Sequence, residues 1–346
     1  MNRHTMIEPT QLIQGLMNRA SRVYEHYHFL LQTHSSQQAA EFTKDFCLNS
    51  SFTATDDQLA CFEFLYMNDF IKELDDLLHD FYKDSKAFCL YKLLLKRRKQ
   101  VITLTELKDL ESLTFNHPSL QCLHLYVIIY LYYDLKMYTA LDKYTDHCYN
   151  CLHEVREPLF YYFMNLRFDE LSFHHYWKTN NLILARKYAF KYSSKVIAPR
   201  KLCSMHHNLS LSYVFENYRS SMHHAQSALQ IALQHNFKSV AAILKNNTIP
   251  FIAAFHKRTK NVSTTDLVET AHIAIAENKW EKASGLLTSL NTLTPFQESY
   301  LGLAERNPSL LINAHQRFLN ENGDLFFAIL PKLYLKRLNQ FIQEGK

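Results

Sequence analysis

The chain has little glycine. Only five of its 346 residues are glycines, at positions 15, 285, 302, 323 and 345, whereas average usage is about 7%. None lies in a cluster of the GxGxxG kind, so the sequence excludes P-loop and dinucleotide-binding sites, which need glycine where the backbone approaches phosphate. Tight hairpin and βα turns also use glycine. Scarce glycine with abundant Leu, Ala, Lys and Gln therefore predicts an all-α protein whose helices are joined by short polar turns.

The chain also lacks a long apolar run. The most apolar stretch, Leu125 to Tyr133 (LYVIIYLYY), is closed by Asp134 and is too short to cross a bilayer. The first residues, MNRHTMIEPTQ, contain no apolar core of a signal peptide. The seven cysteines are scattered and odd in number, which favours a reducing compartment over a disulfide framework. We expect a cytoplasmic protein with no membrane partner.

Catalytic and metal-binding motifs are missing as well. There is no GxSxG, no HExxH and no pair of carboxylates at catalytic spacing. A single CxxC, Cys148 and Cys151, has no second pair to complete a zinc site, and a helix interior explains it better. We expect no enzymatic activity and no cofactor.

Histidine is plentiful, and six of the nineteen histidines occur as doublets. In a helix the two rings of a doublet point about 100° apart, so they cannot share a metal ion as residues four apart can. Polar residues of a surface or groove are the better interpretation. The doublets are His174–His175, His206–His207 and His223–His224.

Apolar residues recur at helical spacing, as in Phe70, Leu74, Leu77, Leu78 and Phe81. Polar turns such as NHPS, RNPS and ENGD divide the sequence into blocks the size of helical hairpins.

A small residue recurs shortly after four of the polar turns, where two helices of a pair would approach closely. The four are Ala140, Ala185, Ala225 and Ala283, spaced by 45, 40 and 58 positions. This pattern resembles tetratricopeptide units, although the spacing departs from their 34-residue period. We predict a right-handed superhelix of degenerate TPR-like helix-turn-helix repeats, whose concave side forms a groove.

The net charge of +5 does not by itself identify a nucleic-acid partner, but two basic runs stand out. One is Lys96 to Lys99, with four consecutive positive residues. The other is Trp177 to Lys201, which holds seven Lys or Arg and no Asp or Glu. Contact with phosphate or an acidic partner and simple solvation of a helix face both explain the two runs. For the second run, a place on the inner face of the superhelix is a third reading.

Several stretches, in their order and spacing, resemble the phage arbitrium peptide receptors (AimR type), relatives of the quorum-sensing peptide receptors of Gram-positive bacteria. Each stretch is loose alone, but together they cover about 300 residues. They are EFTKDFCLNSSFTATDDQLACFEFLYMNDFIKELDDLL, KTNNLILARKYAFKYSSKVIAPRKLCSMHHNLSLSYVFENYRSSMHHAQSAL, ENKWEKASGLLTSL and GDLFFAILPKLYLKRLN.

The resemblance implies a superhelix that closes around a short peptide and forms a homodimer through its C-terminal helices, within a bacterial host cell. It places Arg200 and Asp324 at positions that hold the peptide in such receptors. An arginine can grip a carboxylate with two hydrogen bonds, and an aspartate can pair with a basic side chain. The alternative for Arg200 is a pair with a neighbouring repeat, and for Asp324 it is capping of the following helix.

Other positions depart from the family pattern. Two asparagines that bind the peptide main chain correspond here to His174 and Lys178, and a third corresponds to Leu211, which has neither donor nor acceptor in its side chain. We include His174, Lys178 and Asn208 with Arg200 and Asp324 as candidate peptide-binding residues.

The start of the chain is the larger departure. Family members begin with a helix-turn-helix domain, whereas TQLIQGLMNRASRVYEHYHFLLQTH leads directly into the first repeat. We expect N-terminal helices without a complete helix-turn-helix over residues 1–50, the repeats with the peptide groove over 51–290, and capping and dimerising helices over 291–346. The amphipathic PKLYLKRLNQFIQ is the candidate dimer helix.

Three functions remain open at this point. The first is a non-catalytic regulator that binds a communication peptide and controls phage lysis and lysogeny, or a related response, through a partner. The second is a sequence-specific DNA-binding regulator that uses its first 30 residues or the basic clusters Lys96–Lys99 and Lys187–Lys201. The third is a scaffold that binds a protein on its concave face without a peptide.

Overall fold

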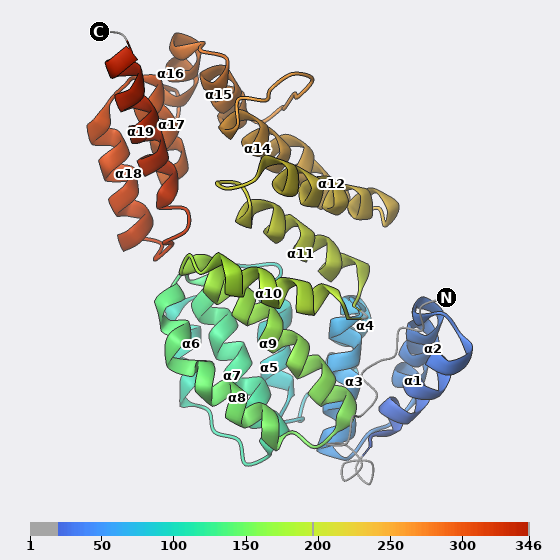
Figure 1. Ribbon diagram of the computed structural model, residues 1–346. Helices are drawn as coiled ribbons and strands as arrows, with labels where there is room; N and C mark the ends of the chain where they lie inside the picture. Colours follow the sequence, from blue (N-terminus) through green and yellow to red (C-terminus); the bar gives the residue numbers. More distant parts are fainter. Residues whose placement is uncertain (1–19, 196, 345–346) are drawn as a thin grey trace. The chain divides into compact units, whose positions relative to one another are not determined.

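The computed structural model describes residues 20–195 and 197–344 (Figure 1). The predicted features on residues 1–19, and the side chain of Ala140, lie outside the described residues. No strand occurs in the described part of the chain, so the all-α prediction is confirmed. No helix there is both long enough and apolar enough to cross a membrane, and the apolar run of the sequence lies within helix α7 (Pro118–Asp134).

The chain forms two compact units. Among the described residues, unit 1 consists of residues 20–175, 190–195 and 197–198, and unit 2 of residues 176–189 and 199–344. The expected segments 1–50, 51–290 and 291–346 divide the chain into N-terminal helices, repeats and capping helices, and not into compact units. This division remains a prediction.

Unit 1 contains eight α-helices of its own and the 3-10 helix η2. They are α1 (Arg22–Thr33), α2 (Ser36–Asn49), α3 (Thr55–Met67), α4 (Ile71–Phe81), α5 (Phe88–Lys96), α6 (Leu104–Ser112), α7, η2 (Tyr138–Tyr144) and α8 (Thr145–Glu154). Two further helices carry residues of both units, α9 (Pro158–Lys178) and α10 (Leu182–Ser193).

Unit 2 continues with nine α-helices and the π-helix η3. They are α11 (Pro199–Ser212), α12 (Tyr218–Gln234), α13 (Lys238–Ile243), η3 (Leu244–Thr248), α14 (Ile249–Phe255), α15 (Leu267–Ala276), α16 (Trp280–Thr288), α17 (Pro295–Ala304), α18 (Pro308–Asn320) and α19 (Ile329–Glu344).

One turn recurs at seven helix ends and takes the place of glycine. After α12, for example, Asn236 adopts φ 56°, and the N–H of Phe237 donates to the carbonyl of Ala232 (2.8 Å). This left-handed residue followed by a six-residue hydrogen-bonded ring is the Schellman arrangement, which usually uses glycine. The same turn is built on Asp69, Lys136, Asn180, Asn236, Lys257, Asn278 and Arg306.

Small residues lie where helices of a pair approach closely, as the sequence predicts. The predicted alanines Ala185, Ala225 and Ala283 are fully buried. Along α12, Ala225 is followed by the buried Ala228 and Ala232, and the Cys203 thiol of α11 donates to the carbonyl of Ala228 (3.2 Å). A seam of alanines thus lets α11 and α12 pack at short range.

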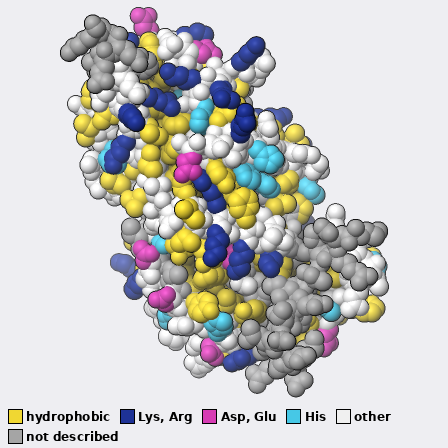
Figure 2. Space-filling model, viewed as in Figure 1, with side chains coloured by type: hydrophobic (Ala, Val, Ile, Leu, Met, Phe, Trp, Pro, Cys, Tyr) yellow, Lys and Arg dark blue, Asp and Glu magenta, His cyan; other side chains and the backbone are white. Residues whose placement is uncertain are grey.

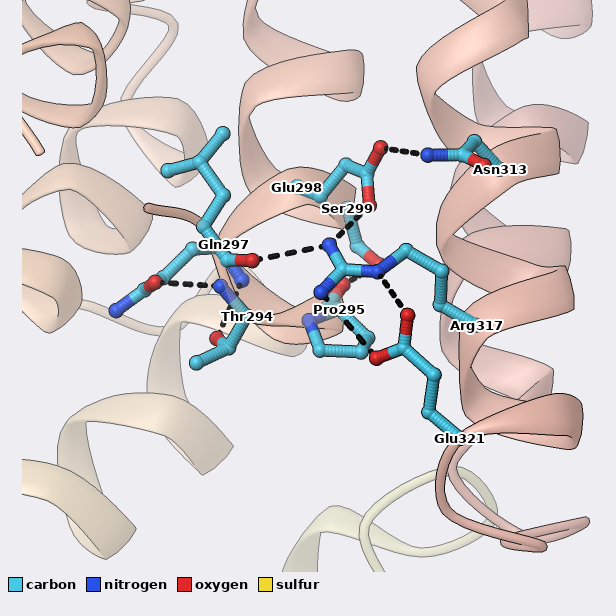
Figure 3. A network of polar contacts seen from close by, with 9 residues as sticks. Thr294, Pro295, Gln297, Glu298, Ser299, Asn313, Arg317 and Glu321 are labelled. Carbon is cyan, nitrogen blue, oxygen red and sulfur yellow. Dashed lines mark hydrogen bonds and ion pairs between the residues drawn. The ribbon is translucent and has the colours of Figure 1, made fainter. Parts of the chain in front are cut away.

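Polar contacts fix the pair α17 and α18. The Arg317 guanidinium donates to Glu298 Oε2 (2.8 Å), Glu321 Oε1 (2.8 Å) and the Leu293 carbonyl (2.9 Å), while Asn313 donates to the other oxygen of Glu298 (Figure 3). Arg317 of α18 thereby contacts both α17 and the loop before it.

Unit 1 has a charged pair in its core. The side chains of Glu63 (α3) and Arg167 (α9) are 0% and 1% exposed, and Arg167 donates Nε and a terminal nitrogen to the two carboxylate oxygens at 2.7 and 3.1 Å. The Tyr91 hydroxyl donates to Glu63 as well (2.8 Å). The pair is therefore satisfied in geometry, as a buried charge requires.

Candidate ligand-binding site

One face of α11 carries two of the predicted site residues. Arg200, Ser204, Asn208 and Leu211 follow one another at intervals of four, four and three, which places them on one side of the helix, and all four are half-buried or exposed. The opposite side, with Cys203 and other buried residues, packs against α12. Along its length this face changes from cationic through hydroxyl and amide to apolar, and Ser204 is its exposed residue.

The Arg200 side chain is held by an aromatic ring. Its guanidinium carbon lies 4.1 Å from the centre of the Phe237 ring, and Phe237 stacks in turn on His235. Stacking uses the flat side of a guanidinium and leaves its N–H groups directed in the plane, where a carboxylate can be bound.

Lys178 and Asp324, both predicted to bind a peptide, lie against each other. Lys178 Nζ is 2.6 Å from Asp324 Oδ2, and each side chain is 7% exposed. The other oxygen of Asp324 accepts from the N–H of Phe327 (2.9 Å), and the N–H of Leu325 donates to the Lys178 carbonyl (3.0 Å). The alternative role of Asp324, capping of the residues that follow it, is thus present in the structure.

His174 belongs to unit 1, whereas the other four candidates belong to unit 2. Its half-buried ring lies 4.6 Å from the ring centre of Tyr133 and 5.1 Å from that of Phe173. The structure thus pairs Lys178 with Asp324 and places Arg200 and Asn208 on one face of α11. His174 lies against aromatic rings of unit 1.

Two of the histidine doublets meet across α11 and α12, which sequence reasoning missed. Nδ1 of His206 and Nδ1 of His224 are 3.0 Å apart, so one donates to the other. His224 also stacks on Tyr213, whose other neighbour is the Arg186 guanidinium at 3.7 Å from the ring centre. Burial lowers the pKa of His224 to about 4, with smaller contributions from His206, His223 and Arg186. Figure 2 shows a group of histidines on one face, among several Lys and Arg side chains.

The basic run Lys96 to Lys99 is occupied by ion pairs within unit 1. Arg97 forms two hydrogen bonds of 2.7 Å with Asp134, and Arg98 lies 2.8 Å from Asp69. Lys96 and Lys99 pair with Glu106 and Asp75. These contacts support a structural role for the run and leave little of its charge for nucleic acid.

The CxxC pair lies in α8, where Cys148 is buried and Cys151 half-buried, both as free thiols. Burial raises the pKa of the Cys148 thiol to about 12. Burial thus disfavours the thiolate, which is the nucleophilic form of this side chain. This observation agrees with the interpretation as a helix interior.

A surface cavity of about 650 Å³ lies in unit 1, between the connection from α2 to α3 and the end of α4. The exposed Phe81 and the buried Phe52 and Tyr82 line it. None of the five predicted site residues is among its lining residues.

Comparisons with known proteins agree with the fold. The structure is similar to the solved structure of phAimR with its ligand, with a TM-score of 0.71 and 15% identity over 86% of this chain and 92% of that chain. It is also similar to the structure of selenomethionine phAimR, with a TM-score of 0.64 and 14% identity over 92% of this chain and 86% of that chain. No curated protein matches the chain.

At these identities the two structures show the fold, and they confirm the prediction of helical repeats. The family model described as AimR transcriptional regulator-like matches residues 39–337, which is most of the sequence. The chain belongs to the AimR transcriptional regulator-like family.

Proposed function

We propose that the protein is a non-catalytic regulator that binds a short communication peptide in unit 2 and controls phage lysis and lysogeny, or a related response, through a partner. The observation that carries this proposal is the face of α11 on which Arg200 and Asn208 lie, in a chain that belongs to the AimR transcriptional regulator-like family. A guanidinium stacked on Phe237 supplies donors for a peptide carboxylate, and the Asn208 amide offers both a donor and an acceptor to a peptide main chain.

The ion pair between Lys178 and Asp324 affects which side chains a peptide ligand needs. Because the ammonium of Lys178 already neutralises Asp324, a peptide does not need a basic side chain at this place. A peptide with a basic side chain must displace Lys178 from Asp324. The buried ammonium of Lys178 then loses its carboxylate partner, which is unfavourable. Binding then shifts the population of conformations only as far as the peptide prefers one of them.

Isothermal titration with a panel of arbitrium-type hexapeptides tests the proposal. We expect micromolar or tighter binding that Arg200→Ala and Asn208→Ala each weaken. Arg219→Ala is the matched control, since it removes an exposed arginine of α12 that is not on this face. Absence of binding to every peptide would contradict the proposal and favour a scaffold that needs no peptide.

Apart from the partner through which it acts, we propose that the protein forms a homodimer through its C-terminal helices. In α19, Leu333 and Leu335 are half-buried within the chain, whereas Lys332 and Lys336 are exposed. Light scattering of the purified protein, alone and with a bound peptide, measures the oligomeric state. A monomer under both conditions would contradict the proposed homodimer but not the proposed peptide binding.

A further inference from the structure

The surface cavity of unit 1 lies at the ends of two helices. Leu48 and Asn49, the last residues of α2, line it, and so do Leu77 and Phe81 of α4, which ends at Phe81. Its lining residues all belong to unit 1. The volume of about 650 Å³ falls in the range of roughly 300–1,000 Å³ that is usual for ligand pockets. The cavity therefore has room for a small molecule or for the side chains of a bound segment.

The wall of the cavity is held in place by hydrogen bonds of the connection from α2 to α3. The N–H of Phe52 donates to the Tyr82 hydroxyl (3.0 Å), and the Gln58 amide donates to the Phe52 carbonyl (3.0 Å). The Ser85 hydroxyl donates to the oxygen of the same Gln58 amide (2.8 Å). The shape of the cavity is thus fixed without a ligand, which reduces the entropy that binding must overcome.

The two helix ends and one carboxylate give the cavity a negative potential. The carbonyl end of a helix carries about half a negative charge, and both α2 and α4 end at the cavity. The last turn of α2 holds no basic residue, and no backbone N–H of the described residues after this helix donates to the carbonyls of that turn. Asp84 adds its carboxylate to the lining and has no ion pair among the described residues.

Cations do not neutralise the lining. Among the described residues that line the cavity, none is Lys, Arg or His. Arg22 contacts the same wall without lining the cavity, since its guanidinium donates to the Ser51 carbonyl (2.8 Å) and lies 4.9 Å from the centre of the Phe52 ring. Lys83 and Lys86 are close in sequence, but neither of them lines the cavity. The wall thus already binds one guanidinium of the chain, and the lining itself keeps its negative charge.

The remaining lining is apolar and aromatic. Phe52 and Leu77 are 3% and 4% exposed, whereas Phe81 is 75% exposed. The face of an aromatic ring attracts a cation, and apolar surface favours the methylene stem of a long basic side chain. An inorganic cation would gain nothing from this apolar part of the lining.

We propose that the cavity binds an organic cation carried on an apolar body. Asp84 and the carbonyl ends of α2 and α4 favour the charge, while Phe52, Leu77 and Phe81 contact the apolar part. An arginine or lysine side chain of a partner protein and a free arylalkylamine share this chemistry. The inference concerns unit 1 and does not depend on the peptide proposal, which concerns unit 2.

Saturation-transfer NMR of the full chain with three probes of one shape tests the inference. Phenylbutylamine is a cation, phenylbutanol is neutral and phenylbutyrate is an anion. We expect the amine to bind about tenfold more tightly than the alcohol, because the helix ends, the aromatic rings and the carboxylate each favour the charge by a factor of a few. The anion should bind most weakly of the three.

Two variants with matched controls assign the binding to the cavity. Asp84→Asn should weaken the amine about threefold and leave the alcohol unchanged, whereas Phe81→Ala should weaken both. The controls Asp109→Asn and Phe29→Ala replace exposed residues of unit 1 that do not line the cavity, and they should change neither affinity. All four side chains are exposed, so folding does not depend on them.

Several outcomes would overturn the inference. They are equal affinity for the amine and the alcohol, tighter binding of the anion, binding of no probe at millimolar concentration, and equal losses in the variants and their controls. Competition by a blocked Phe-Arg-Phe tripeptide distinguishes the two sources, since displacement of the amine assigns a partner's side chain and its absence assigns a free amine. Titration of Asp84→Asn with arbitrium-type hexapeptides keeps the two proposals apart, because Asp84 is not on the α11 face.

Discussion

Lys178 and Asp324 are 146 positions apart in the sequence and form a buried ion pair with 2.6 Å between Nζ and Oδ2. The pair, with the hydrogen bond from the Leu325 N–H to the Lys178 carbonyl, joins the end of α9 to the residues before α19. Both residues were predicted from the sequence as ligand contacts. In the structure they satisfy each other.

Removing one partner should therefore be costly. Lys178→Ala leaves the Asp324 carboxylate buried and unpaired, and we expect a loss of about 3–5 kcal/mol in the free energy of unfolding. Lys178→Met/Asp324→Leu should lose less, because no charge is left without a partner. Urea unfolding measures both, and a single variant within 1 kcal/mol of wild type would contradict the expectation.

The glycines of α16 and α17 offer a matched comparison. A Cβ at Gly302 would lie 3.0 Å from two side-chain atoms of Leu311, whereas a Cβ at Gly285 meets nothing within 4 Å. Gly302→Ala should destabilise the protein by about 1–3 kcal/mol through crowding of α17 against α18. Gly285→Ala should stabilise it by up to about 1 kcal/mol through helix propensity. Thermal unfolding that shifts both variants in the same direction would contradict this.

Unit 2 should lose stability in mild acid. Burial lowers the pKa of His206, His207, His224 and His256, so these imidazoles are neutral in the folded state. Above a pH of about 6.5 the unfolded chain is neutral as well, and below it the unfolded chain binds protons that the folded chain does not. We expect the melting temperature to fall from pH 6.5 towards pH 4, with a smaller slope for His224→Gln. A profile that is flat in wild type would exclude the effect.

Unit 1 contains a group with the opposite response. Glu157 accepts hydrogen bonds from Ser21 and from the N–H of Phe160, and burial raises its pKa to about 7. Since the folded pKa is above that of the unfolded chain, the stabilisation is complete below a pH of about 4.5 and is lost as the pH rises to 7. Glu157→Gln should remove this contribution. In urea unfolding, we expect the midpoint at pH 8, relative to that at pH 5, to be higher for Glu157→Gln than for the wild type. An unchanged difference between the two midpoints would contradict this.

The sequence was informative about helices and about small residues. Scarce glycine and periodic Leu and Ala predicted an all-α chain, and the alanines at 185, 225 and 283 are buried where helices meet. These are local properties, which depend on a few neighbours along the chain. The left-handed turns on Asn236 and Lys257 were not predicted, because nothing in composition marks a non-glycine residue that adopts positive φ.

The partners of charged side chains were harder to predict. From the sequence, the run Lys96 to Lys99 fits contact with phosphate or an acidic partner as well as simple solvation. The structure shows instead that it pairs with Asp134, Asp69, Asp75 and Glu106. The meeting of His206 with His224 likewise depends on how α11 packs against α12. Contacts between residues far apart in sequence are set by packing, which a single sequence does not reveal.

The long-range buried polar contacts have a consequence for kinetics. Consecutive helices are joined by short turns, so hairpins can form early and almost anywhere along the chain. The contacts of Ser21 with Glu157, Glu63 with Arg167 and Lys178 with Asp324 span 136, 104 and 146 positions. Closing loops of this length costs conformational entropy before the contacts can stabilise the fold. They should therefore form after the transition state, where they set the lifetime of the folded protein by slowing unfolding while leaving the folding rate nearly unchanged.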